Sequence, residues 1–96
     1  MNCDFGWDPG KARQNTQKHG VSFEQAATVF RDSRALSIYD DSHSGTEDRW
    51  VTLGVSPDAG LLAAHHTYEE VDESTVRIRI ISSRKATKRE TAQYLE

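Results

Sequence analysis

One short run of alternating residues limits the possible folds more than any other part of the sequence. Val76, Ile78 and Ile80 alternate with Arg77 and Arg79. Successive side chains of a β-strand point to opposite faces, so this run needs one buried face and one polar face. A chain of 96 residues has room for a single hydrophobic core. The pattern therefore predicts one domain in which a sheet carries helices on one side.

The remaining patterns predict an α+β domain over residues 1–96, with an antiparallel sheet of about four strands. Two helices precede the strands and one helix follows them. Leu95 and Glu96 match residues that cloning leaves before a tag and carry no weight in this prediction. The expected elements are a short strand at Phe5–Trp7, helices near 9–19 and 22–33, strands at 36–39, 49–55, 61–68 and 76–81, and a helix from Thr87 to about Tyr94.

The helix limits rest on capping residues. Asp8 and Pro9 suit a helix start, because the aspartate accepts from free amides and proline needs no N–H there. Gly20 suits a helix end, since glycine adopts the left-handed conformation at low cost. Ser22 and Thr87 are each followed three residues later by Gln or Glu, which is the capping-box pattern.

The charged residues are unevenly distributed. The net charge of −3 argues against diffuse attraction to nucleic acid. Residues 77–89 nevertheless contain six Lys or Arg and no acid, and residues 11–19 add three more. Acidic residues gather in 40–48 and 69–73. This separation predicts a basic face and an acidic face on one small domain.

Several classes of protein are excluded by what the sequence lacks. The single cysteine, Cys3, rules out an intrachain disulfide and a multi-cysteine zinc site. The longest apolar run, 61–64, is far shorter than the roughly 18 residues of a membrane span. We therefore expect a small, soluble, cytoplasmic domain without a membrane partner and without a cofactor.

The histidines do not form a recognisable metal site. His65 and His66 are adjacent in a predicted strand, so they point to opposite faces and do not share one ion easily. His43 with Asp40 or Asp41 has no characteristic ligand spacing. We expect no metal site, and a metal-dependent hydrolase remains the less favoured alternative.

The polar residues suit metal-free cleavage of RNA. This reaction needs a base for the 2′-hydroxyl proton, cations for the charge on phosphorus and an acid for the leaving oxygen. Arginine binds phosphate oxygens bidentately, and Glu, His or Lys supplies the proton transfers. The candidates are Lys18 and His19 at a helix end, Glu47 and Arg49 where a loop meets a strand, Arg77 and Arg79 on one strand face, and Arg84 just beyond that strand.

Spacing alone leaves open whether these groups meet. Lys11, Asn15, Lys18 and His19 share one helix face, which is either an RNA-binding face or an exposed polar face. Each candidate also has a plain structural explanation. Lys18 and His19 complement the helix dipole, Glu47 and Arg49 form a surface pair, and Arg77 and Arg79 keep a strand edge soluble.

Three blocks of residues follow one another along the chain. They are Phe5-x-Trp7-Asp8-Pro9-x-Lys11-x-x-x-Asn15-x-x-Lys18-His19-Gly20-Val21-Ser22-Phe23-Glu24-x-Ala26, then Asp41-x-His43-Ser44-x-x-Glu47-x-Arg49, then Arg79-Ile80-Ile81-Ser82-Ser83-Arg84-x-Ala86-Thr87-x-x-Glu90-x-x-x-Tyr94. Together with Gly54, these blocks resemble the BrnT family of toxins of type II toxin–antitoxin systems. The resemblance covers residues 5–94.

The resemblance implies a RelE-like fold and a ribonuclease activity that inhibits translation. It also implies a BrnA-type antitoxin with a ribbon-helix-helix part, and repression of the operon by the complex. Operator DNA is then contacted only through the antitoxin complex. The residues that match family motif positions, and that we predict to be catalytic, are Lys18, His19, Glu47, Arg49, Arg79 and Arg84, with either Glu47 or His19 as the base. The predicted RNA-binding residues are Lys11, Asn15, Arg77, Lys85 and Lys88.

The sequence departs from the family pattern at a few positions. Ser83 stands where the family commonly has Ala, and Thr91 and Leu61 stand where it often has Arg. Ala63 and Ala64 replace more β-branched residues. The Thr91 difference supports an alternative function, in which the chain is a weak or inactive enzyme that acts only as antitoxin partner and corepressor.

Overall fold

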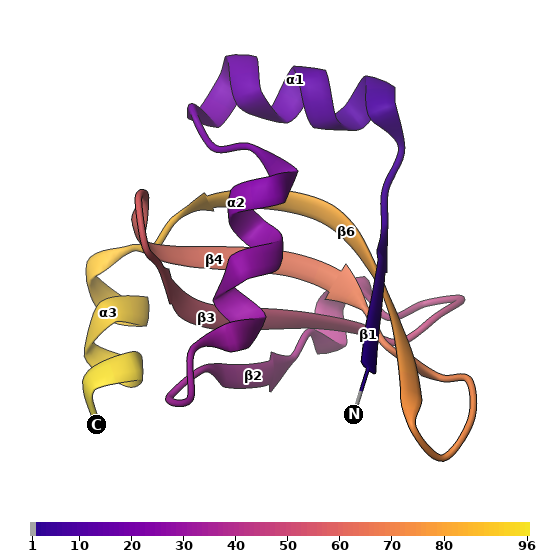
Figure 1. Cartoon of the computed structure of the whole chain (residues 1–96). Helices are drawn as coiled ribbons and strands as arrows, with labels where there is room; N and C mark the ends of the chain where they lie inside the picture. The colour runs from indigo at the N-terminus through magenta and orange to yellow at the C-terminus, as the bar shows by residue number, and fades with distance from the viewer. Residues whose placement is uncertain (1) are drawn as a thin grey trace.

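The computed structural model of the chain describes residues 2–96, so Met1 of the predicted domain lies outside the described residues (Figure 1). The elements are β1 (Asn2–Gly6), α1 (Pro9–His19), α2 (Phe23–Thr28), η1 (Val29–Arg31), β2 (Leu36–Tyr39), η2 (Asp41–His43), β3 (Arg49–Ser56), β4 (Gly60–Thr67), β5 (Glu69–Glu70), β6 (Thr75–Lys85) and α3 (Lys88–Leu95). The α+β class is therefore confirmed. No helix among residues 2–96 has the length and apolar character needed to cross a membrane.

The sheet is mixed and has more strands than predicted. Its order is β1-β6-β4-β3-β2, with the short β5 also paired to β6. β1 runs parallel to β6, with Asn2 beside Thr75 and Gly6 beside Arg79, and the other pairs are antiparallel. The expected antiparallel sheet of about four strands is confirmed in part: β2, β3, β4 and β6 form it, but the parallel strand β1 and the short β5 are added to it. Local patterns reveal a strand but not its partner, and β1 pairs with residues about 70 positions away.

Capping residues set the helix ends as predicted. Asp8 accepts from the Lys11 amide at 2.9 Å, and Gly20 ends α1 with φ of 69°. Ser22 begins α2 and Thr87 begins α3, each with a complete capping box. These local bonds satisfy amides that a helix start otherwise leaves free, so short helices form here without long apolar stretches.

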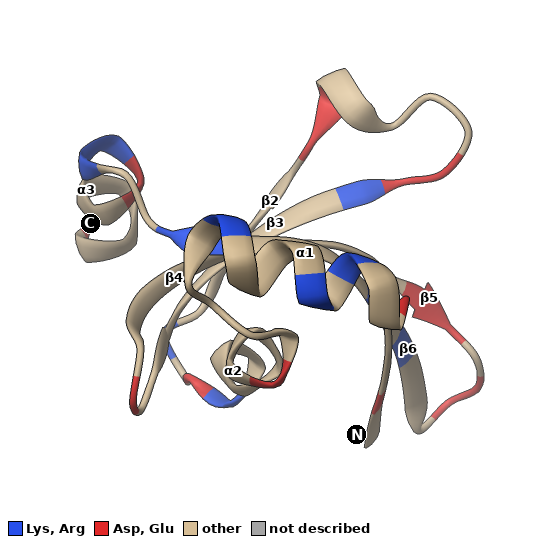
Figure 2. Cartoon of the chain, turned by 90° about the horizontal axis from the view of Figure 1, so that it is seen from above, with Lys and Arg blue, Asp and Glu red and all other residues tan. Residues whose placement is uncertain are grey.

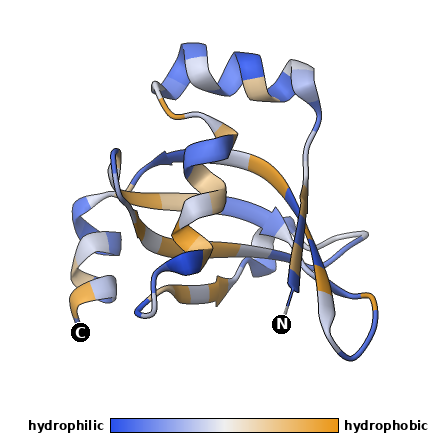
Figure 3. Cartoon of the chain, in the orientation of Figure 1, coloured by the Kyte–Doolittle hydropathy of each residue, from blue (hydrophilic) through white to orange (hydrophobic). Residues whose placement is uncertain are grey.

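The hydrophobic core lies between α2 and one face of the sheet. Val21, Phe23 and Val29 are fully buried there against strand residues such as Leu62 and Ile78. Figure 1 shows α2 crossing in front of the strands, while α1 lies along the β6 edge. Figure 3 shows that α1 is hydrophilic along most of its length. The sheet face that points away from α2 is called the open face below.

The third helix is not on the same side as the other two. α3 lies at the end of the sheet (Figure 1), and its Glu90 binds Arg84 on the open face. Its Tyr94 hydroxyl donates to Asp32 Oδ2 at 2.5 Å, which attaches the helix to the segment after η1. The prediction of helices on one side of the sheet was therefore wrong, because the Arg84–Glu90 ion pair and the long-range hydrogen bond from Tyr94 to Asp32 hold α3 elsewhere.

A β-bulge at Ile81 changes which residues of β6 reach the open face. His65 pairs with Ser82 but His66 pairs with Ile80, so Ile81 is an extra residue in the ladder. Before the bulge, alternate residues such as Ile80 enter the core. After the bulge the alternation is shifted, and Arg84 lies on the open face. β6 continues to Lys85, four residues beyond the predicted end.

Gly54 provides a test of this packing. A Cβ at Gly54 lies 2.8 Å from the carbonyl oxygen and 2.9 Å from the Cβ of Val29, so the backbone of η1 leaves no room for it. We expect Gly54→Ala to lower the free energy of unfolding by about 1–3 kcal/mol, measured by urea denaturation. Gly45→Ala is the control, since a Cβ there meets nothing within 4 Å. Equal effects of the two variants would show that η1 does not pack on β3 in this way.

Candidate active site

Two hollows meet at the bulge of β6 and together form the candidate site. Both are lined by Ile81 and Ser82, which makes them neighbours across one strand. The first, called the helix hollow, is otherwise lined by Lys11, Gln14, Asn15, Lys18 and His19 of α1. The second, called the histidine hollow, is otherwise lined by Asp40, His43, Arg49 and His65.

The helix hollow carries unpaired cationic side chains. Lys11 and Lys18 form no ion pair with any carboxylate of residues 2–96. Lys18 and His19 lie in the last turn of α1, which ends at Gly20 in the left-handed conformation. The structure thus brings Lys11, Lys18 and His19 together, as their shared helix face predicted, with charge available for an anion.

Asn15 is a structural residue. It is only 6% exposed. Its side-chain amide forms hydrogen bonds with β6 and with the segment that follows α1. Its Nδ2 donates to the carbonyls of Val21 at 2.9 Å and Ser83 at 2.8 Å, and its Oδ1 accepts from the Ser83 amide at 3.1 Å. These bonds use both hydrogens of Nδ2 and one lone pair of Oδ1, so we remove Asn15 from the RNA-binding set.

Glu47 connects two of the predicted arginines. Its carboxylate forms an ion pair with Arg79 of β6 and lies 3.9 Å from a guanidinium nitrogen of Arg49. Arg49 begins β3, and its backbone amide donates to Ser44 Oγ at 2.9 Å, which holds the loop before the strand. The Nε of Arg49 is buried and has no hydrogen-bond partner among residues 2–96. The guanidinium of Arg49 therefore has donor capacity left for a ligand in the histidine hollow.

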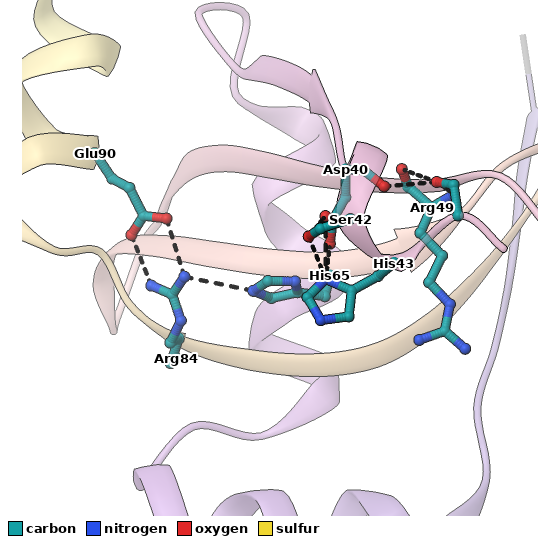
Figure 4. Close-up of polar contacts among 8 residues, drawn as sticks. Asp40, Ser42, His43, Arg49, His65, Arg84 and Glu90 are labelled. Atoms are coloured by element: carbon teal, nitrogen blue, oxygen red, sulfur yellow. Dashed lines mark hydrogen bonds and ion pairs between the residues drawn. The ribbon is translucent and has the colours of Figure 1, made fainter.

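Arg84 is held between a carboxylate and an imidazole. It donates to both oxygens of Glu90, at 2.6 Å and 3.0 Å, and its Nη2 lies 3.4 Å from Nε2 of His65 (Figure 4). The hydrogen bonds from Arg84 lower the pKa of Glu90 to about 2, although partial burial opposes this. Burial, followed by the charge of Arg84, lowers the pKa of His65 below its ordinary value.

The Glu90 ion pair makes stability depend on pH in acid. Because the pKa of Glu90 is about 2 in the folded chain and 4.5 in a free glutamate, its contribution is complete above pH 4.5. That contribution is lost as pH falls toward 2. We expect the midpoint of thermal unfolding to fall less steeply between these pH values in Glu90→Gln than in the unchanged chain. Parallel pH curves for the two proteins would contradict this prediction.

The remaining predicted RNA-binding residues lie outside the two hollows, as do Glu47, Arg79 and Arg84. Arg77 lines a separate hollow together with Glu47 and Arg79. Arg77 lies 3.6 Å from the carboxylate of Asp4 and 4.0 Å from that of Glu69. Lys85 donates to the carbonyl of Ala59 at 2.7 Å. Lys88 begins α3 and is exposed. The structure therefore does not gather these three residues with the helix hollow.

Sequence reasoning missed His65 as a site residue. The sequence indicated His65 only as a possible metal ligand, and the expectation that the two adjacent histidines face opposite ways is confirmed. His66 is 2% exposed and packs on Phe30, while His65 lines the histidine hollow. The alternation of side chains along a strand indicates that one of the two histidines faces away from the core. It does not indicate which residues of other elements contact that histidine.

The charge separation predicted from the sequence is present in space only in part, because Arg77 and Arg79 form ion pairs with Glu69 and Glu47 of the acidic segments. Figure 2 shows Lys and Arg along α1 and where β6 leads into α3, and Asp and Glu on the two loops toward the other end of the sheet. No group of three or more His, Cys, Asp or Glu among residues 2–96 is arranged to hold a metal ion.

A comparison with protein families supports a relationship for nearly the whole chain. A family model described as "Ribonuclease toxin, BrnT, of type II toxin-antitoxin system" matches residues 7–90. This range contains every residue that lines the two hollows, and also Glu90. No curated protein matches the chain.

Proposed function

The chain belongs to the BrnT family of ribonuclease toxins of type II toxin–antitoxin systems, and from this premise we propose that it is a metal-independent endoribonuclease that inhibits translation in the cytoplasm. The observation that supports this most is the meeting of the two hollows at Ile81 and Ser82. An RNA strand that crosses β6 there has Lys11 and Lys18 on one side and Arg49 on the other.

The proposed chemistry uses arginine and lysine side chains in place of a metal ion. Arg79 and Arg84 stabilise negative charge on the scissile phosphate, and Lys18 positions the phosphate or gives a proton to the leaving oxygen. Glu47 or His19 is the candidate base from the sequence. Arg49 adds a further positive charge beside the phosphate. The rest of the RNA strand is contacted by Lys11, Arg77, Lys85 and Lys88.

Arg79 is more readily available to substrate than Arg84. The Arg79 and Glu47 side chains are 51% and 40% exposed, and such exposed pairs contribute only about 0–1 kcal/mol. A phosphate can therefore replace Glu47 at low cost. Arg84 and Glu90 are 30% and 17% exposed and joined by two hydrogen bonds, so Glu90 fixes the orientation of Arg84.

The partner that we propose is an antitoxin of the BrnA type with a ribbon-helix-helix part. The family is one of type II systems, in which toxin and antitoxin are both proteins. An acidic, amphipathic antitoxin segment suits the cations of α1 and of residues 77–89, because opposite charges favour association. We further propose a RelE-like fold and repression of the operon by the complex.

Expression of the chain without an antitoxin tests the proposal. We expect growth arrest with RNA decay, and RNA cleavage by the purified protein that continues in the presence of EDTA. Cleavage that disappears with EDTA would identify a metal-dependent hydrolase instead. Harmless accumulation, with no cleavage in vitro, would support the alternative of an inactive corepressor. The observation that favours that alternative is that Arg79 and Arg84 already form ion pairs with Glu47 and Glu90.

A further inference from the structure

We propose that His65 is a catalytic residue of this chain and that its Nε2 takes the 2′-hydroxyl proton of the RNA. This inference rests on the proposed ribonuclease function and replaces Glu47 and His19 as the base. His65 lies on β4 and lines the histidine hollow with Arg49 and Ser82. It lies opposite Ser82 in the β4–β6 ladder, next to the bulge where the two hollows meet.

The contact with Arg84 assigns the unprotonated nitrogen of His65 by donor chemistry. A guanidinium only donates hydrogen bonds, so Nε2 of His65, 3.4 Å from Nη2 of Arg84, faces it as an acceptor. Two hydrogen bonds to Glu90 fix the guanidinium in turn (Figure 4). Glu90, Arg84 and His65 therefore form a chain of contacts. The lone pair of His65 Nε2 lies beside the guanidinium that we propose to bind the phosphate.

The surroundings keep the imidazole neutral near pH 7. Burial has the largest effect and lowers the pKa of His65, and the positive charge of Arg84 lowers it further. Asp40 and Glu90 oppose these effects and His43 adds to them. The titratable or charged groups that face the imidazole are Arg84 of β6, Glu90 of α3, Asp40 and His43 around η2, and Arg49 of β3. A neutral imidazole is the form that accepts a proton.

The two earlier candidates are placed less well for this role. Glu47 forms an ion pair with Arg79 and lies near Arg49, so its carboxylate is occupied by cations. His19 lines the helix hollow, where Lys11 and Lys18 are its charged neighbours. His65 is the histidine that directly contacts an arginine proposed to bind the phosphate.

The proposed step is balanced without any co-reactant. The incoming phosphate takes over the hydrogen bond from Arg84, which frees the lone pair of His65 Nε2. Nε2 takes the 2′-hydroxyl proton as O2′ bonds to phosphorus, and the bond from phosphorus to O5′ breaks. O5′ receives a proton from Lys18 or water, so the products are a 2′,3′-cyclic phosphate and a 5′-hydroxyl. The imidazolium then returns its proton to solvent.

The pH dependence of RNA cleavage by His65→Gln tests this role. We expect the kcat/KM of the unchanged chain to fall with acid with a midpoint below pH 6.5, as His65 becomes protonated. His65→Gln should be about 10²–10⁴-fold slower and should lose this acid limb. His43→Gln, on another wall of the same hollow, should keep the limb whatever its rate. Thermal unfolding of each variant shows whether it is folded.

Measurement on the free protein gives an independent readout. NMR of the imidazole nitrogens should show His65 titrating below pH 6.5 with its proton on Nδ1. Arg84→Gln should raise that midpoint, because a repelling positive charge is removed. Titration at or above pH 6.5, or an unchanged acid limb in His65→Gln, would overturn the inference while leaving the ribonuclease proposal intact. Absence of cleavage by the unchanged chain would overturn the ribonuclease proposal itself.

Discussion

Replacement of Arg79 by alanine should slow RNA cleavage by about 10²–10³-fold, the usual cost of removing one donor that stabilises a charged transition state. Arg79 forms an ion pair with Glu47, and the same carboxylate lies 3.9 Å from a guanidinium nitrogen of Arg49. The loss should appear mainly in kcat, because the charge on phosphorus is greatest in the transition state. Cleavage assays with purified protein measure it directly, and expression without antitoxin should no longer arrest growth.

Arg79→Ala should still fold, which separates this effect from a loss of structure. The side chain is 51% exposed and contributes no core packing, so we expect the free energy of unfolding to change by no more than about 0.5 kcal/mol. Arg13→Ala is the matched control, since Arg13 is an exposed arginine of α1 that forms no ion pair with Glu47 or any other carboxylate of residues 2–96. If Arg79→Ala cleaves RNA as fast as Arg13→Ala, Arg79 does not stabilise the transition state.

Replacement of Asn15 by alanine should strongly destabilise the fold. It removes the partner of the amide and the carbonyl of Ser83 on the α1 side, whereas the carbonyl of Val21 keeps the Thr16 hydroxyl at 3.4 Å. Each buried group without a partner costs about 1–3 kcal/mol, whereas the better helix propensity of alanine returns only about 0.5 kcal/mol. We therefore expect a loss of several kcal/mol, measured by urea denaturation.

A neighbouring substitution shows whether this loss is specific. Gln14 lies beside Asn15 on α1 and lines the same hollow, but it is exposed. Gln14→Ala should change the free energy of unfolding by no more than about 0.5 kcal/mol. Equal stability of the two variants would show that Asn15 does not join α1 to β6, and would return it to the set of possible RNA contacts.

Local sequence patterns predicted most elements of this fold, although β1 is Asn2–Gly6 in place of the expected Phe5–Trp7 and the short β5 was not expected. The capping residues Asp8, Gly20, Ser22 and Thr87 set helix ends as expected, because caps act within a few residues of the chain. The alternation at 76–81 correctly indicated a strand with one buried face. The parallel partner of that strand and the place of α3 were not predicted, because both depend on contacts between distant segments.

The residues of the candidate site were predicted better than their arrangement. Most charged candidates were named from residue type and resemblance. Asn15 looked like part of a polar helix face, yet its bonds are to Ser83 and Val21. His65 was overlooked, because its partner Arg84 is 19 residues away in the sequence.

The sequence by itself determined the family, the α+β class, the helix ends and the separation of basic from acidic segments. These follow from residue type and short-range spacing. Only the tertiary structure decided that Arg79 and Arg84 share the open face. Five positions apart, they point to opposite sides of a regular strand, but the extra residue at Ile81 reverses the alternation between them. A bulge is set by the register against β4, and register is a property of two strands that neither strand carries alone.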